Sequence, residues 1–355
     1  MAEIKFGLDT FGDNQVDDNG APISSAQTIR NLIAQGVLAD SLGINSINVG
    51  EHHRDDFAVT APDTVLAGLA TVTKQITLGT GVTVLSSEDP VRVYERFATL
   101  DALSNGRAEI TAGRGSFIES FPLFGYDLKD YEILFSEKLE LLVELLKEKA
   151  VTWSGKTRAP LFNQEVYPKT ERGAIPLRVG VGGTPESAVR AARLGLPMAL
   201  AIIGGNPARF SAFSNLYRTS LMEFGKPDLP ISIHSPGHIS DTDEQAREEQ
   251  WPHYLRMFGR IGAERGWSPP TKEQFIAEIE HGSQYVGSPV TVAKKIVHAV
   301  TSVGAQRFDF KYSNGPQPHS KLMKSIELYG TKVIPLVKEM LASKYSLLTG
   351  RSAVW

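Results

Sequence analysis

The sequence predicts an α/β fold in which eight β/α units form a TIM barrel, (β/α)8, with insertions after the fourth and seventh strands. Short runs rich in β-branched residues alternate with longer stretches of helical periodicity, which is the pattern of helices packed around a parallel sheet. The chain has 355 residues, and α/β barrels use about 200 to 400 residues as one unit. We therefore expect a single domain over residues 1–355.

The first four units are the most regular part of the sequence. Ile29, Ile33 and Val37 recur at the spacing of one helical face. Gly43 ends this helix, and Pro90 opens a later one at the position where a missing N–H is tolerated. We expect strands over 4–9, 44–49, 76–85 and 107–112, and helices over 26–42, 62–73 and 90–103.

Two irregular segments interrupt the rest of the chain. Residues 113–176 contain a long amphipathic helix over 131–149 and then an irregular stretch with polar and aromatic residues over 152–175. Residues 240–287 are helix-rich and charged. Such insertions suit segments that close over a site. Between and after them we expect strands over 177–181, 198–203, 231–239 and 308–312, and helices over 185–194, 207–224, 288–303 and 320–341.

Composition excludes several classes of function. The formal net charge is −3 and the sequence pI is near 6.3, so nucleic acid is not favoured as the main ligand. The sequence contains no cysteine, which excludes thiol nucleophiles, cysteine-ligated metal sites and disulfides. The longest uncharged apolar run, 194–205, is shorter than the ~20 residues that a membrane span needs, and the N-terminus lacks an apolar signal core. We expect a soluble, cytoplasmic protein that binds neither nucleic acid nor membrane.

The turn after the fifth expected strand has the residues of an anion site. Gly182 and Gly183 remove side chains where the strand passes into a helix. Thr184 suits the N-cap and Pro185 the first helical position, which leaves backbone N–H groups at the positive end of the helix. Arg114 follows the neighbouring strand, and its guanidinium fork suits a phosphate. A turn that only caps a helix and an arginine with only a structural role would give the same sequence pattern. The position of the turn and Arg114 at the ends of adjacent strands favours a phosphate site.

A second cluster follows the second expected strand, at the edge where TIM barrels carry their active sites. His52 and His53 lie there, and a neutral imidazole can accept a proton near pH 7. A histidine that only bonds a neighbouring loop is an equal alternative for either residue. Asp9, at the end of the first strand, could face the same mouth, and of His234 and His238 on the seventh strand we expect one to face it and the other to pack.

A metal-dependent hydrolase is a weaker interpretation of the same residues. His52, His53, Asp55 and Asp56 are residue types that ligate metals. Adjacent histidines on an extended segment point to opposite sides, however, and no second cluster in the sequence completes a metal cage. We therefore expect no metal site.

Several short motifs occur together in a fixed order between about Ile4 and Phe213. They are Glu51-His52-His53, Gly79-Thr80-Gly81, Pro90-Val91-Arg92, Gly106-Arg107, Gly113-Arg114-Gly115 and Gly195-Leu196-Pro197-Met198. In order and spacing this series resembles the bacterial-luciferase-like flavin-dependent monooxygenases. Each motif alone is weak, but the whole series is specific.

The resemblance implies a (β/α)8 barrel that binds reduced flavin mononucleotide (FMN) and activates oxygen. It assigns proton handling to the residue at His52 and the flavin phosphate to Arg114 and the turn at Gly183 and Thr184. It also implies a non-prolyl cis peptide below the flavin ring, which here is Gly81–Val82. The expected site is therefore His52 for catalysis and Thr80, Gly81, Val82, Arg114, Gly182, Gly183, Thr184 and Ile202 for the cofactor, with Ile202 as an apolar wall.

The resemblance also implies partners. The sequence has no fingerprint for a nicotinamide dinucleotide, so we expect a separate flavin reductase to supply reduced FMN, with O2 and a small organic molecule of unidentified structure as substrates. Gly113 stands where light-emitting members carry a reactive cysteine, which argues against luminescence. A flavin carrier without chemistry is the main alternative, and the family also includes deazaflavin users.

A homodimer is expected through the helices that follow the second and third strands. Small residues on one helix facing large ones on the other suit close helix packing. The same pattern would arise if these helices packed only on their own strands. The residues concerned are Ala67, Gly68 and Ala70 on one helix and Tyr94, Phe97 and Leu100 on the other.

Overall fold

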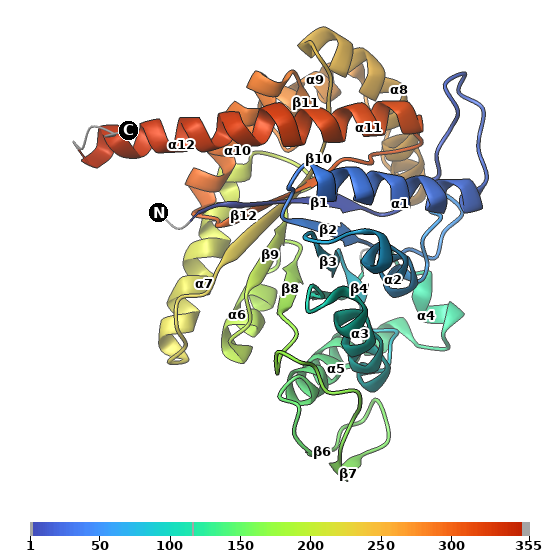
Figure 1. Cartoon of the computed structure of the whole chain (residues 1–355), viewed down its shortest axis with the longest axis vertical. Coiled ribbons are helices and arrows are strands. Elements are labelled where there is room, and N and C mark those ends of the chain that lie inside the picture. The colour runs from blue at the N-terminus through green and yellow to red at the C-terminus, as the bar shows by residue number, and fades with distance from the viewer. Residues whose placement is uncertain (1–2, 116, 350–355) are drawn as a thin grey trace.

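A parallel sheet that curls into a barrel, with helices around it, forms the fold of the computed structural model, which describes residues 3–115 and 117–349 (Figure 1). The barrel strands are β1 (Lys5–Thr10), β2 (Ser46–Val49), β3 (Thr77–Thr80), β4 (Thr83–Val84), β5 (Ile110–Gly113), β8 (Leu177–Val181), β9 (Met198–Ala201), β10 (Ile231–Ile239) and β12 (Arg307–Lys311). Neighbours follow the order β3-β2-β1-β12-β10-β9-β8-β5-β4. A parallel bridge from Leu78 in β3 to Ala108, just before β5, joins the two ends of the sheet. The predicted barrel class is confirmed.

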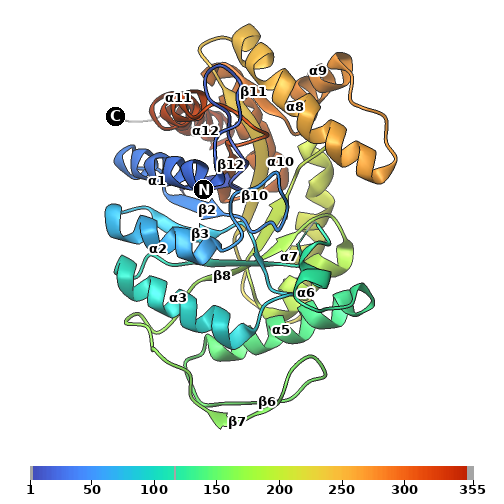
Figure 2. The ribbon, with the colours of Figure 1, turned by 90° about the vertical axis from the view of Figure 1, so that its right-hand side faces the viewer.

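Helices cover the outside of the barrel, and Figure 2 shows α1, α2, α3 and α5 side by side along one flank. The last predicted helix, 320–341, is two helices joined by a π-helical turn over 329–333. No helix within the described residues is long and apolar enough to cross a lipid bilayer. The outer helices are α1 (Ser25–Ser41), α2 (Pro62–Val72), α3 (Pro90–Ser104), α5 (Tyr131–Leu145), α6 (Pro185–Leu194), α7 (Ser211–Glu223), α10 (Pro289–Val303), α11 (His319–Leu328) and α12 (Ile334–Thr349).

The third barrel strand, which the sequence predicts as one run over 76–85, is divided into β3 and β4. β3 pairs with β2 and β4 pairs with β5. The peptide bond between them, Gly81–Val82, is cis, as the resemblance implies. A Cβ atom at Gly81 would lie 2.4 Å from Oδ1 of Asp9, so a side chain does not fit there. β3 and β4 together occupy one position, which gives the barrel its eight positions.

Four charged residues lie inside the barrel, and we call Glu109, Arg178, Arg307 and Asp309 the floor cluster. Three are buried, and the Arg307 side chain is 11% exposed. Arg178 lies 2.9 Å from Glu109 and 3.1 Å from Asp309. Arg307 lies 2.7 Å from each of the same two carboxylates. Burial would raise the pKa of Glu109, but the two arginines lower it to about 2. A Cβ atom at Gly7 would collide with Asp309, so glycine there makes room for the cluster.

The first insertion follows the fourth barrel strand, β5, as predicted. It contains α4 (Ser120–Leu123), α5 and an antiparallel pair of strands, β6 (Val151–Trp153) and β7 (Leu161–Gln164). The sequence predicts only an irregular stretch over 152–175, because these strands are short and largely exposed. Figures 1 and 2 both show the pair at the lower end of the molecule, away from the barrel.

The second insertion follows the seventh barrel strand, β10, and lies at the opposite end of the molecule (Figure 2). It is helix-rich as predicted, with α8 (Asp243–Arg265) and α9 (Lys272–Glu280). A short strand that the sequence analysis missed, β11 (Tyr285–Gly287), pairs in parallel with β10. The insertion has a small apolar core of its own, formed by Ala246, Tyr254, Phe275, Ile279 and Val286.

The large residues of the expected dimer contact are part of the barrel's own core. Tyr94, Phe97 and Leu100 in α3 are buried within the single chain, and so is Ala70 in α2. Gly68 in α2 is exposed. The small-against-large pattern on these helices is therefore explained by packing inside one chain, and it is not by itself a sign of a dimer.

Candidate active site

An anion cradle, by which we mean Arg114, Thr184, Ser187 and Arg190, lies where β5 and β8 end. Nη2 of Arg114 is 3.1 Å from the hydroxyl of Ser187 and 3.5 Å from that of Thr184. The two hydroxyls are 2.6 Å apart. The structure thus brings together Arg114 and Thr184, which the sequence analysis selected. It adds Ser187 and Arg190, which the analysis missed although they lie one helical turn apart on the same helix, α6.

The backbone of the cradle leaves room for a ligand. A Cβ atom at Gly182 or Gly183 would meet nothing within 4 Å in the described part of the chain. Gly183 has a φ of +114°, a conformation that favours glycine. Thr184 occupies the N-cap of α6 as predicted, but its hydroxyl is turned to Ser187 and Arg114. Pro185 has no N–H and the N–H of Ser187 donates to the carbonyl of Thr184 at 3.1 Å, so the N–H of Glu186 is the one in the first turn of α6 that no side-chain cap satisfies.

Glu132, near the start of α5, contacts both arginines of the cradle. It forms ion pairs with Nη1 of Arg114 and, at 2.7 Å, with Nη2 of Arg190. Nη1 of Arg190 is buried and has no hydrogen-bond partner among the described residues. The cradle therefore has donors beyond those that Glu132 satisfies.

His52 lies directly after β2 in a box of three phenylalanine rings. Its ring centroid is 4.5 Å from those of Phe11 and Phe57 and 5.1 Å from that of Phe117. The residue is only 7% exposed, and its Nε2 has no hydrogen-bond partner within residues 3–115 and 117–349. Burial, and after it the charge of Lys311, lowers the pKa of His52 to about 3. The imidazole is therefore neutral at pH 7, with one ring nitrogen that no described residue satisfies.

A second titratable pair lines the mouth. Asp9, in β1, is paired with Nδ1 of His234, in β10. The His234 ring stacks on Phe11 with centroids 5.7 Å apart. Burial raises the pKa of Asp9, and the His234 pairing offsets only part of that effect. Sequence analysis placed Asp9 at the mouth and left open which of His234 and His238 would face it; it missed Phe11 and the pairing itself.

The Gly81–Val82 peptide lies between the Asp9 side of the mouth and the Gly113 side, where Arg114 of the cradle follows. On one side Gly81 lies against Asp9. On the other, a Cβ atom at Gly113 would lie 2.5 Å from the side chain of Val82, so Val82 occupies the space that a cysteine at position 113 would need. Thr80 is fully buried below this peptide, with its hydroxyl 2.9 Å from that of Thr83.

Ile202, the expected apolar wall, follows the end of β9. Its side chain is fully buried, like those of Met198 and Leu200. Side chains on a strand alternate between faces, so these three share the face that packs on the helices. The exposed neighbour is Ile203. The role of Ile202 stays a prediction, and Ile203 is better placed for it.

Three of the four residues of the metal interpretation pair with other side chains, and the fourth, His52, lies in the phenylalanine box. No group of three or more His, Asp or Glu residues in the described part of the chain is arranged to hold a metal ion. The geometry therefore gives no support to a metal-dependent hydrolase. The pairs are His53 with Glu51 at 2.9 Å, Asp55 with Arg260 at 2.5 Å, Asp56 with Arg54 at 3.0 Å and His238 with Glu249 at 2.8 Å.

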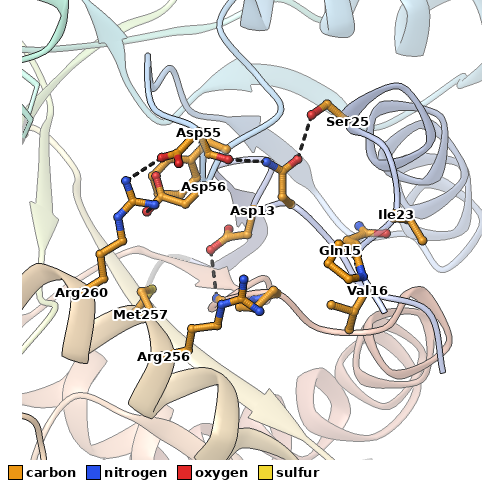
Figure 3. A pocket seen from close by; sticks show the side chains of 15 residues that line it. Asp13, Gln15, Val16, Ile23, Ser25, Asp55, Asp56, Arg256, Met257 and Arg260 are labelled. Carbon is orange, nitrogen blue, oxygen red and sulfur yellow. Dashed lines mark hydrogen bonds and ion pairs between the residues drawn. The ribbon is translucent and has the colours of Figure 1, made fainter. Parts of the chain in front are cut away.

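A cavity of about 250 Å³ lies beside Phe57, and Figure 3 shows the residues that line it. Its walls are the loops after β1, β2 and β12, and α8 of the second insertion covers it. Phe57 belongs both to this lining and to the box around His52. Figure 3 shows Arg256 and Arg260 reaching toward the cavity from α8, with Arg260 bound to Asp55.

Comparison with known proteins identifies the family. A family model described as luciferase-like monooxygenase matches residues 4–307. The chain belongs to this family. The alkanal monooxygenase alpha chain of Aliivibrio fischeri is 30% identical over 320 residues, covering 81% of this chain and 88% of that protein. The resemblance drawn from the motifs is confirmed.

Several solved structures share the fold. A monooxygenase from Streptomyces bottropensis matches with a TM-score of 0.81 at 22% identity, over 94% of this chain and 99% of that one. The oxygenating constituent of 3,6-diketocamphane monooxygenase from Pseudomonas putida, in complex with FMN, matches with a TM-score of 0.74 at 18% identity, over 94% and 98%. The coenzyme F420-dependent tetrahydromethanopterin reductase of Methanopyrus kandleri matches with a TM-score of 0.72 at 20% identity, over 94% and 99%.

Proposed function

We propose that this luciferase-like protein is a monooxygenase that uses reduced FMN and O2 to oxidise a small organic substrate. The observation that carries the proposal is the arrangement of the mouth: an anion cradle on one side, a buried neutral His52 on the other, and Gly81–Val82 between them. A flavin with its phosphate in the cradle would extend its ring toward this peptide. FMN, when bound, supplies the redox chemistry with oxygen.

The cradle fits a phosphate by its chemistry. Arg114 and Arg190 offer two guanidinium groups, and Ser187 and Thr184 offer hydroxyls beside them. The open backbone at Gly182 and Gly183 adds N–H groups and space. Each charge-assisted hydrogen bond would contribute ~1.5–3 kcal/mol to binding. The two positive charges suit a phosphate monoester, such as that of FMN, better than a neutral group.

His52 supplies the feature that separates an oxygenase from a flavin carrier. A carrier has no need of a buried, neutral histidine whose Nε2 lacks a partner in the described ranges. In an oxygenase this nitrogen can hold or accept a proton at the reacting atoms, inside a box from which the phenylalanine rings exclude water. Thr80, Gly81 and Val82 would support the flavin ring, and Ile203, the exposed neighbour of Ile202, is the better-placed wall on the β9 side.

The organic substrate is assigned to the cavity beside Phe57. Its lining includes the apolar residues Val16, Phe57 and Met257, and the Phe57 ring also packs against His52, with centroids 4.5 Å apart. A separate flavin reductase is the proposed functional partner.

We also propose a homodimer through the outer surfaces of α2 and α3. Sedimentation of the free protein tests that assembly, and the mass of a single 38.7 kDa chain would contradict it.

Replacing Arg114 tests the phosphate assignment. Arg114→Ala should weaken FMN binding about 10- to 100-fold, because it removes charge-assisted bonds to the phosphate, while riboflavin binding changes little. Fluorescence titration of the free protein with each ligand measures this. Arg193→Ala on the same helix as Ser187 removes an exposed arginine outside the cradle and serves as the control. Equal weakening of FMN and riboflavin would overturn the assignment. Parallel titration with coenzyme F420 decides between the two cofactor types.

A further inference from the structure

Glu132 occupies the open side of the anion cradle. One of its oxygens pairs with Nη1 of Arg114, and the other lies 2.7 Å from Nη2 of Arg190. The two arginines come from different segments, one after β5 and one in α6. A carboxylate that bridges two guanidinium groups makes the same kind of contact that phosphate oxygens make with arginine.

Glu132 nevertheless leaves the cradle unsatisfied. Two guanidinium charges face a single carboxylate, so one positive charge has no counterpart in the group. Nη1 of Arg190 is buried without a partner in the described part of the chain. A phosphate monoester brings up to two negative charges and three acceptor oxygens. It would therefore match the cradle better than Glu132 does.

The two arginines are held in place without help from Glu132. The guanidinium carbon of Arg114 lies 5.1 Å from the ring centre of Tyr131, and that of Arg190 lies 5.4 Å from the ring centre of Phe135. Glu132 itself is 59% exposed. Ion pairs that are open to solvent are weak and easily exchanged. The carboxylate can therefore leave while the arginines keep their positions.

We propose that Glu132 is an internal stand-in for the cofactor phosphate, which pairs with Arg114 and Arg190 in the empty cradle and gives way when the phosphate binds. This inference rests on the proposed function, because it takes the cofactor to carry a phosphate monoester. Glu132 keeps the arginines paired between binding events and competes with the incoming phosphate. It thus limits affinity for the phosphate-bearing cofactor and favours its exchange, which suits a protein that receives reduced FMN from another protein and releases the oxidised form.

Glu132→Gln tests the inference without any turnover. We expect FMN to bind about five- to tenfold more tightly, because a competing negative charge has been removed, and riboflavin to bind as in the wild type. Inorganic phosphate, followed by ³¹P NMR, should show the same gain. Glu144→Gln is the matched control: it lies on the same helix, α5, and is exposed, but it pairs with Lys147. It should leave FMN and phosphate binding unchanged.

The outcomes separate the inference from the function on which it rests. If wild type binds FMN and Glu132→Gln binds it no more tightly, Glu132 is not a stand-in. If riboflavin gains as much as FMN, the effect does not act through the phosphate, and the inference is also overturned. If neither FMN nor phosphate binds to wild type or variant, the phosphate site of the proposed function fails and the inference with it.

Discussion

The floor cluster and the mouth of the barrel are both built from buried charged and polar side chains, but they differ in how these groups are paired. At the floor, two arginines and two carboxylates alternate, and each has an opposite charge within 3.1 Å. At the mouth, Oδ1 of Asp9 and Nε2 of His52 are buried without a hydrogen-bond partner in the described residues.

This difference indicates where binding energy is available. A buried polar atom without a partner costs about 1–3 kcal/mol, so a fold retains it only where something else uses it. The charges of the floor cluster are paired with one another, so they are not available to a ligand. The mouth keeps His52 neutral by burial and leaves its Nε2 without a partner in the described residues. His52 is two residues from Gly50, whose backbone packs against the carbonyl of Gly81, at the cis peptide that interrupts the third barrel strand.

The largest expected effect is at the floor. Arg178→Met would leave Glu109 and Asp309 with one arginine between them, and removing one partner of a buried ion pair costs about 3–5 kcal/mol of unfolding free energy. Urea unfolding followed by circular dichroism measures it. Lys147→Met, which breaks an exposed pair with Glu144, should cost less than about 1 kcal/mol. Similar losses for both variants would mean that the floor is no better paired than the surface.

At the mouth, the expected effect is on activity. His52→Gln should slow substrate oxygenation about 100-fold or more, because the group that handles the proton is lost, while FMN affinity stays within about threefold of wild type. The rate is measured with added reductase and a substrate found by screening. His281→Gln, a substitution of an exposed histidine, is the control. Full oxygenation by the His52 variant would favour another proton-handling group at the mouth, with Asp9 and His234 the nearest candidates.

The smallest effect concerns pH. The pKa of His52 is about 3 in the folded protein and about 6.5 when unfolded. Below pH 6.5 the unfolded chain gains a proton that the folded chain does not, so His52 contributes stability above that pH and the contribution falls as the pH falls. The unfolding free energy of the wild type should fall by about 2 kcal/mol more than that of His52→Gln when the pH is lowered from about 7 to about 5. Urea titrations of both proteins at each pH measure the difference in their unfolding free energies. If that difference is the same at both pH values, His52 is not held neutral by burial.

The regular units of the barrel were predictable because their signals are local. The strands expected over 177–181 and 231–239 and the helix over 185–194 agree with the structure at both ends. β-branched runs, a proline at the first helical position and a closing glycine mark these limits. β6, β7 and β11 carried no such signal: each has three or four residues, too few to show a period.

The candidate site divides in the same way. Residue types and backbone turns alone indicated Arg114, the glycines at 182 and 183 and the histidine at 52, because the ends of parallel strands meet at one rim. Ser187, Arg190 and Glu132 were not foreseeable, since nothing in a helical pattern states which neighbour its polar face will meet. Ile202 was selected because an apolar residue suits a wall of the site. Its side chain faces the helices instead, because side chains on a strand alternate between its two faces.

The sequence by itself determined the barrel class, the positions of both insertions and a phosphate-suited turn beside an arginine. Only the tertiary structure decided which side chains are partnered: Asp9 with His234, 225 residues away, and Glu132 with Arg190, 58 residues away. The reason is that backbone preferences and periodicity act over a few residues. Pairing across the mouth depends on how the sheet closes and on the register of its strands, which no short segment contains.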